Sequence, residues 1–203
     1  ENESVPDGDS IFEIGSLTKA FTGMLLADMV ERGGAKLSDP ISKYLPDDVN
    51  SPKPDGKEIT LKELATHSAG FPLIADNFWS AEANRYDPNQ AGDAWHAYSA
   101  EKIYAYLNDP KPPLGERGKY VYSNLGVGLL GHLLSRAAEK PYEELLRERI
   151  LAPLGMNSTT IAPLTSWAML RPATVISVSV DGRSTCRSRM WVFDIPFAFA
   201  TAT

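Results

Sequence analysis

Ser16 and Lys19 are the residues whose types and spacing most directly indicate chemistry. Side chains three positions apart share one face of a helix, so the lysine amine can reach the serine hydroxyl. The start of a helix and apolar neighbours both disfavour a cation, and a neutral lysine beside a serine can activate the hydroxyl as a nucleophile. The pair is therefore a candidate for acyl transfer through Ser16.

The same tetrapeptide also has a structural interpretation, in which Ser16 caps a helix and Lys19 snorkels to solvent. S-x-x-K is short and common, so the tetrapeptide alone favours this interpretation. The chain holds a second copy, Ser99-Ala100-Glu101-Lys102, which serves as an internal control. Ser99 follows a polar loop and Glu101 suits a first helical turn, so we interpret this copy as a helix cap.

The stretch after Ser16 predicts a central helix that runs to about Arg32, before Gly33. Its only polar side chains between Lys19 and Val30 are Thr22 and Asp28. A helix that is apolar on nearly every side is a buried helix, so we expect burial all round. The apolar positions that follow the helical period are Leu17, Ala20, Phe21, Met24 and Leu25.

A second candidate group is Tyr122-Ser123-Asn124, where an extended segment enters a predicted helix over 124–139. Residues two apart in extended chain point the same way, so Tyr122 and Asn124 can face one cleft. A phenol near an ammonium can pass protons, and an asparagine offers a donor and an acceptor to a substrate amide. The alternative is a core tyrosine and a helix-capping asparagine.

Other signals place the remaining elements. Thr60-Leu61-Lys62-Glu63 has the form of a capping box and predicts a helix over 60–66, and Pro141 suits the start of a helix that ends near Ile150. Residues 73–98 form a long aromatic loop, which is either a binding-site wall or a satellite core. Alternation over 176–180 before Asp181-Gly182 predicts a β-hairpin.

Composition excludes several classes of function. The chain has 203 residues, 43% of them hydrophobic, and a formal net charge of −6, which argues against nucleic acid as a partner. Cys186 is the single cysteine, and the three histidines lack the spacing of zinc ligands, so we expect no metal and no organic cofactor. No apolar run reaches membrane-spanning length, and residues 1–10 are acidic and polar, so we expect no signal peptide.

The composition changes near Pro163. No lysine follows Lys140 and no histidine follows His132, while arginine continues. We therefore expect a helical region over 1–162 and a divergent tail over 163–203 that carries the predicted hairpin.

Four motifs in order carry a resemblance to a known family: FEIGSLTK at 12–19, LATHSAGFP at 64–72, YSNLG at 122–126 and ILAPLGM at 150–156. Together they resemble the class C β-lactamase family, which includes D-alanyl-D-alanine carboxypeptidases and serine esterases. The resemblance implies an α/β serine β-lactamase-like fold and a bacterial periplasmic or secreted location. It implies that Ser16 is acylated, Lys19 accepts its proton, Tyr122 shuttles protons and Asn124 contacts a substrate amide. His67 falls in a turn that is structural in the family.

The sequence departs from the family in one motif. The family has a Lys or His followed by Ser/Thr-Gly on a late strand, and no Lys or His follows Lys140 here. That strand supplies one oxyanion-hole amide, the other being the backbone N–H of Ser16. Only about ten residues precede Ile11, too few for the family's N-terminal strand pair. We therefore expect mainly the helical region, with most of the antiparallel sheet missing, and self-association through uncovered apolar surface.

These observations predict a serine hydrolase that acts weakly on small molecules: a β-lactam, an ester or a peptidoglycan-like peptide. One alternative is a carboxylesterase on small esters. Another is a non-catalytic remnant that binds ligands or partners through the aromatic loop.

Overall fold

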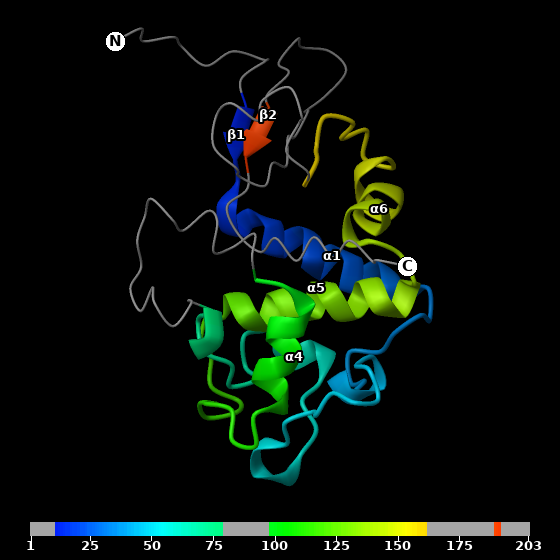
Figure 1. Cartoon of the computed structure of the whole chain (residues 1–203). Helices are drawn as coiled ribbons and strands as arrows, with labels where there is room; N and C mark the ends of the chain where they lie inside the picture. Colours follow the sequence, from blue (N-terminus) through cyan, green and yellow to red (C-terminus); the bar gives the residue numbers. More distant parts are fainter. Residues whose placement is uncertain (1–10, 79–97, 162–188, 192–203) are drawn as a thin grey trace, which may run out of the picture.

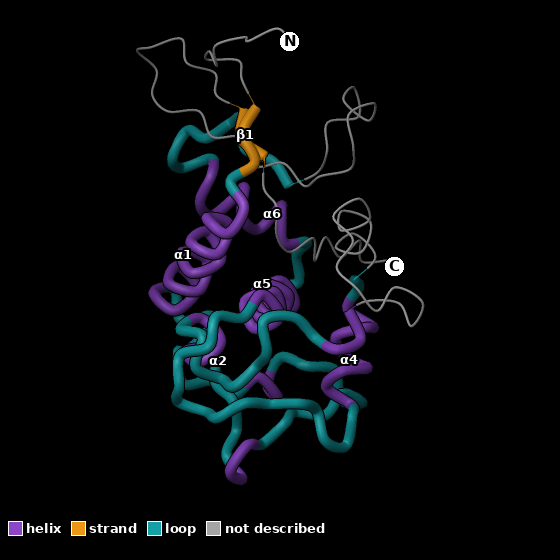
Figure 2. Tube along the Cα trace, turned by 90° about the vertical axis from the view of Figure 1, so that its left-hand side faces the viewer, coloured by secondary structure: helices purple, strands orange, loops and turns teal. Residues whose placement is uncertain are grey.

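Two helices packed on each other form the centre of the structure, α1 (Thr18–Glu31) and α5 (Asn124–Ala138) (Figure 1). The computed structural model describes residues 11–78, 98–161 and 189–191. Figure 2 views α5 nearly end-on, with α1 to one side and a layer of loops and short helices below. The shorter helical elements are η1 (Gly15–Leu17), η2 (Ile41–Lys43), η3 (Pro54–Gly56), α2 (Leu61–Ala65), η4 (Asp76–Phe78), α4 (Ala100–Asn108), α6 (Tyr142–Leu146) and the π-helical η5 (Arg147–Leu151).

The described residues contain one small sheet. Strand β1 (Ile11–Glu13) pairs in parallel with β2 (Arg189–Trp191), and Ile11 lies opposite Arg189. An isolated antiparallel bridge joins Pro40 to Thr60. The predicted hairpin at 176–182 and the predicted boundary at 163 lie outside the described residues. The described part is therefore mainly helical, with β1 leading through η1 into α1.

The buried central helix is α5. Every residue from Asn124 to Ser135 is buried, and Leu129, Leu130 and Leu133 are fully enclosed. A side chain at Gly131 would meet the Tyr142 ring at 3.2 Å, so glycine allows α6 to pack closely. The predicted helix over 124–139 is confirmed, and it ends at Glu139 in the left-handed conformation.

The expectation that α1 is buried on nearly every side is wrong. One face of the helix, including Phe21, Leu25 and Met29, packs in the core. The opposite face is exposed, with Leu17 63% and Met24 39% accessible. Many of the residues of α1 that are not polar are alanine or glycine, and these small residues are compatible with exposure. The lack of charged residues therefore did not mean burial. We call the exposed residues the α1 apolar face: Leu17, Ala20, Met24 and Ala27.

Two aromatic residues of the loop over 73–98 belong to the core. Phe78 and Tyr98 are buried, with ring centroids 5.1 Å apart. The rest of the loop, 79–97, lies outside the described residues, so its predicted role as a binding-site wall stays a prediction. No helix in the part of the chain that the structure describes is long and apolar enough to cross a membrane.

The α1 apolar face generates a prediction of self-association, because an exposed apolar stripe on a helix gains free energy when another surface covers it. Met24→Glu should shift the chain towards the monomer in size-exclusion chromatography with light scattering. Leu154→Glu is the matched control, because Leu154 is 62% exposed and lies outside this face. A wild-type chain that is strictly monomeric and binds no apolar-surface dye would contradict the prediction.

His132 generates a prediction about pH and stability. The Tyr104 hydroxyl lies 2.5 Å from Nε2 of this buried histidine, and burial lowers the pKa of His132 to about 4. As the pH decreases from 6.5 to 4, the unfolded chain takes up a proton that the folded chain does not. The free energy of unfolding should therefore decrease as the pH decreases. The His132 contribution is roughly 3 kcal/mol. Urea unfolding of wild type and His132→Gln at pH 7 and pH 4.5 measures this contribution. If both proteins lose the same free energy of unfolding between the two pH values, His132 is not the cause of the loss.

Candidate active site

Ser16, Lys19 and Tyr122 meet at one oxygen atom. The Tyr122 hydroxyl donates to Ser16 Oγ at 2.5 Å, and Lys19 Nζ donates to the same oxygen at 3.0 Å. Lys19 Nζ also lies 4.9 Å from the centre of the Tyr122 ring, where a cation is attracted by the ring face. The structure thus joins a hydroxyl, an amine and a phenol from segments 106 positions apart.

A tight turn presents Ser16 to solvent. Gly15 has φ 51°, which favours glycine, and Leu17 N–H donates to the Ile14 carbonyl at 3.1 Å. Leu17, not Ser16, holds the N-cap position of α1, without a side-chain cap. The interpretation of Ser16 as a helix cap is therefore wrong. Ser16 is exposed.

The start of α5 places Tyr122 and Asn124 differently. Ser123 caps the helix, since its hydroxyl accepts from Gly126 N–H at 2.8 Å and donates to the Pro72 carbonyl at 2.6 Å. The alternative in which Asn124 is the cap is wrong. Asn124 is only 8% exposed, and its buried Oδ1 accepts no hydrogen bond from the described residues. The structure brings Tyr122 to Ser16 and buries the Asn124 amide oxygen at the start of α5.

The segment that carries Tyr122 is bound along its length to the turn at 67–73. Glycine is required within this turn, because Gly70 has φ +84° and a Cβ there would lie 2.6 Å from the Gly115 carbonyl oxygen. Four backbone N–H groups donate to carbonyls of the turn: Gly115 to Gly70 at 2.7 Å, Gly118 to Ser68 at 2.8 Å, Val121 to His67 at 2.8 Å and Asn124 to Leu73 at 2.9 Å. The turn therefore sets the position of Tyr122.

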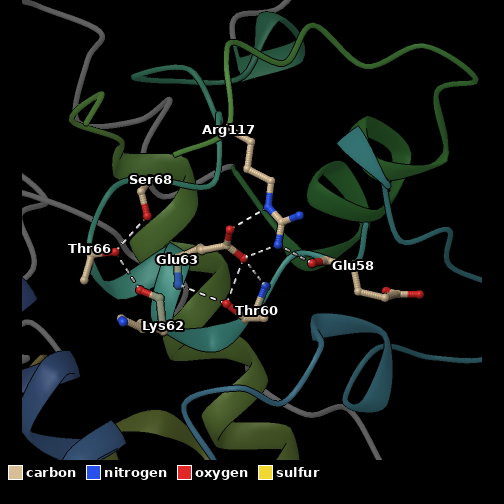
Figure 3. A network of polar contacts seen from close by, with 7 residues as sticks. All are labelled: Glu58, Thr60, Lys62, Glu63, Thr66, Ser68 and Arg117. Atoms are coloured by element: carbon tan, nitrogen blue, oxygen red, sulfur yellow. Dashed lines mark hydrogen bonds and ion pairs between the residues drawn. The ribbon is translucent and has the colours of Figure 1, made fainter. Parts of the chain in front are cut away.

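A polar network secures the other side of this segment (Figure 3). The predicted capping box is present, with Thr60 and Glu63 bonded reciprocally. Arg117 Nε lies 2.5 Å from Glu63 Oε1, its Nη2 lies 2.9 Å from Oε2, and both side chains are more than four-fifths buried. Burial raises the pKa of the Glu63 carboxyl, but the hydrogen bonds from Arg117 and Thr60 outweigh it, so the pKa is lowered. A charged bidentate pair thus ties α2 to the segment before Tyr122.

Sequence reasoning missed the contact of Arg117 and placed His67 only in a structural turn, without its partner. Arg117 meets Glu63 across 54 positions, and His67 accepts the Ser123 N–H at Nδ1 across 56 positions. The histidine stood in a motif and the arginine in none. The described residues hold no group of three or more His, Cys, Asp or Glu side chains that could bind a metal ion.

The second S-x-x-K copy, Ser99 to Lys102, has different neighbours from Ser16 and Lys19. Ser99 occupies the N-cap position of α4, as expected, although its side chain makes no capping hydrogen bond. Lys102 Nζ lies 5.9 Å from the centre of the Tyr98 ring. The two copies of one tetrapeptide therefore have different environments.

Comparisons with known proteins point to one family. The Beta-lactamase family model matches residues 2–183. The D-alanyl-D-alanine-carboxypeptidase/endopeptidase AmpH of Escherichia coli strain K12 is 35% identical over 167 residues, which are 80% of this chain and 40% of that protein. A Beta-lactamase of Pseudomonas fluorescens is 32% identical over 159 residues, 76% of this chain and 37% of that protein.

Solved structures agree. A Beta-lactamase/D-alanine carboxypeptidase from Yersinia pestis has a TM-score of 0.69 and 34% identity over 81% of this chain and 44% of its own. A class C beta lactamase from Rhodobacter sphaeroides has a TM-score of 0.61 and 26% identity over 89% of this chain and 47% of its own.

The chain spans about 40% of the length of the curated relatives it matches. The mainly helical character of the described residues agrees with the expected representation of the fold by its helical region. The extent of the family match, the identity to relatives and the fold together show that this chain belongs to the beta-lactamase family and has a serine β-lactamase-like fold.

Proposed function

We propose that this chain carries the nucleophile of a serine hydrolase, which transfers acyl groups through an ester on Ser16 Oγ. The observation that supports this most strongly is the convergence of the Tyr122 hydroxyl and Lys19 Nζ on Ser16 Oγ, at 2.5 and 3.0 Å. Two groups capable of proton transfer within hydrogen-bond reach of an exposed hydroxyl are what activation of a serine requires.

Ser16 becomes reactive when one of its two neighbours can accept a proton. In the arrangement described above, both neighbours donate to Ser16 Oγ. When Lys19 or Tyr122 loses a proton, the Ser16 O–H donates to that group instead, and the oxygen can attack a carbonyl carbon as its proton moves across. We assign Lys19 as the proton acceptor. Tyr122 is the shuttle, which gives its hydroxyl proton to the leaving atom and takes the proton back from Lys19.

Asn124 is the proposed contact for a substrate amide. Its Oδ1 is buried and unpaired, and a buried acceptor without a donor costs about 1–3 kcal/mol. A substrate N–H at the start of α5 would supply that donor. The proposed role therefore concerns binding and orientation.

The proposed substrates are small acyl compounds: a β-lactam, a small ester or a peptidoglycan-like peptide. The relatives named above are a carboxypeptidase/endopeptidase and a beta-lactamase. The periplasmic or secreted location that the family resemblance implies for this chain suits such substrates. The 203 residues contain no Lys or His after Lys140, the residue types with which the family's late motif engages a substrate carboxylate, and we expect weak hydrolysis from these residues by themselves. A carboxylesterase on small esters is the second candidate, because serine esterases share the first two motifs of the family; nitrophenyl esters tested beside a chromogenic cephalosporin distinguish the two.

The two S-x-x-K copies provide a matched test of the nucleophile. A fluorescent penicillin should label wild type and Ser99→Ala, and Ser16→Ala should carry no label, because only Ser16 Oγ has the amine and phenol beside it. Gel fluorescence and the intact mass of each protein measure the adduct. An adduct that survives in Ser16→Ala would remove Ser16 as the nucleophile, and no adduct on any of the three would favour the non-catalytic alternative.

Substitution of the amine tests its role as base. Lys19→Arg keeps a cation but not a proton acceptor, because arginine stays protonated. Acylation should slow by at least about 10²-fold, the lower range for loss of a general base. Lys102→Arg is the control and should label at the wild-type rate. If Lys19→Arg labels as fast as wild type between pH 6 and 9, Lys19 is not the base.

A further inference from the structure

His67 contacts the residues before and after Tyr122 and also the Tyr122 ring. The His67 carbonyl accepts the Val121 N–H at 2.8 Å, and its ring Nδ1 accepts the Ser123 N–H at 3.1 Å. These are the residues directly before and after Tyr122. The His67 ring also packs on the Tyr122 ring, with centroids 4.7 Å apart at 37°. One residue therefore contacts the residues on both sides of Tyr122 and the Tyr122 ring.

The backbone of His67 is in an unusual conformation. Its φ is 56°, in the left-handed region that few non-glycine residues adopt. Such a conformation persists only where surrounding contacts compensate for its cost. The two hydrogen bonds from the Tyr122 segment, together with the His67 N–H bond to the Leu64 carbonyl, are contacts of this kind.

The bond to Ser123 requires a neutral ring. Facing or near His67 are Lys19 from α1, Tyr120 and Tyr122 from the segment before α5, and Glu63 from α2, which is paired with Arg117. Burial, and then the positive charge of Lys19, lower the pKa of His67. The ring is therefore neutral at pH 7, and Nδ1 keeps the lone pair that accepts the Ser123 N–H, with the proton on Nε2.

We propose that His67 is a positioning residue, which holds the Tyr122 hydroxyl against Ser16 Oγ by accepting hydrogen bonds from the N–H groups of Val121 and Ser123 and by packing on the Tyr122 ring. Its consequence for reaction rate rests on the proposed function. A displacement of about 1 Å at a reacting group costs about 10²-fold in rate. The loss should appear in the acylation rate at saturating ligand, because His67 does not itself bind the ligand.

Two substitutions separate the contacts of the side chain. Asparagine supplies an acceptor oxygen for Ser123 N–H and tolerates the left-handed conformation, but it lacks the ring. Phenylalanine keeps a ring and leaves the Ser123 N–H without an acceptor. With a fluorescent penicillin at saturation, His67→Phe should be acylated about 10²-fold more slowly than wild type, and His67→Asn within about 10-fold of wild type.

His132→Phe is the matched control, because it makes the same substitution in the core, away from Ser16. It should lower the thermal unfolding midpoint and leave the acylation rate of the folded protein unchanged. Rates are compared after correction for the folded fraction of each variant. If His67→Phe is acylated at the wild-type rate, or slows only as much as His132→Phe, the positioning role is wrong and the proposed function is untouched.

A second measurement does not depend on activity. Nitrogen-15 NMR of the wild-type histidine ring should show an unprotonated Nδ1 and a hydrogen-bond coupling between Nδ1 and the Ser123 amide. A proton on Nδ1, or no coupling, overturns the inference whether or not penicillin labels the chain. If wild type carries no label but the coupling is present, the proposed function fails and His67 still positions Tyr122.

Discussion

The backbone pairing between the turn at 67–73 and the segment that ends at Asn124 is the constraint on which the rest of the site depends. Because this turn contains a left-handed histidine and a left-handed glycine, it follows the partner segment closely enough for four hydrogen bonds. A side chain at Gly70 would collide with the Gly115 carbonyl. Without that pairing, Tyr122 would lie on a solvent-exposed loop with no fixed relation to Ser16.

The helix pair converts this local constraint into a site. Ser16 lies just before α1 and Tyr122 just before α5, and the two packed helices begin at the same end of the molecule (Figure 1). Burial of α5 makes its start a rigid reference point, and Ser123 ties that start to the turn through Pro72. The proposed chemistry therefore depends on residues outside the group of Ser16, Lys19 and Tyr122.

Local signals predicted much of this structure. The capping box at Thr60 and the helix over 124–139 depend on residues close in sequence, and the structure confirms them. The family that the motifs indicated is confirmed by the comparisons. Burial of α1 was predicted wrongly, because alanine and glycine suit either environment. Ser123 and Asn124 are both good helix caps, so only the backbone conformation at Ser123 decides between them. The contacts of His67 and Arg117 span more than fifty positions, so the partners of neither residue could be predicted from residues close in sequence.

The interaction to test is the placement of Ser16 Oγ, the proposed nucleophile, against two groups capable of proton transfer, Lys19 and Tyr122. Rapid-mixing kinetics with an activated nitrophenyl ester, combined with intact mass, test it most directly. We expect a burst of nitrophenol of up to one equivalent per chain and a matching acyl mass on the protein. Further nitrophenol should then be released slowly. Linear nitrophenol release from the first turnover, with no acyl mass on the chain, would contradict it.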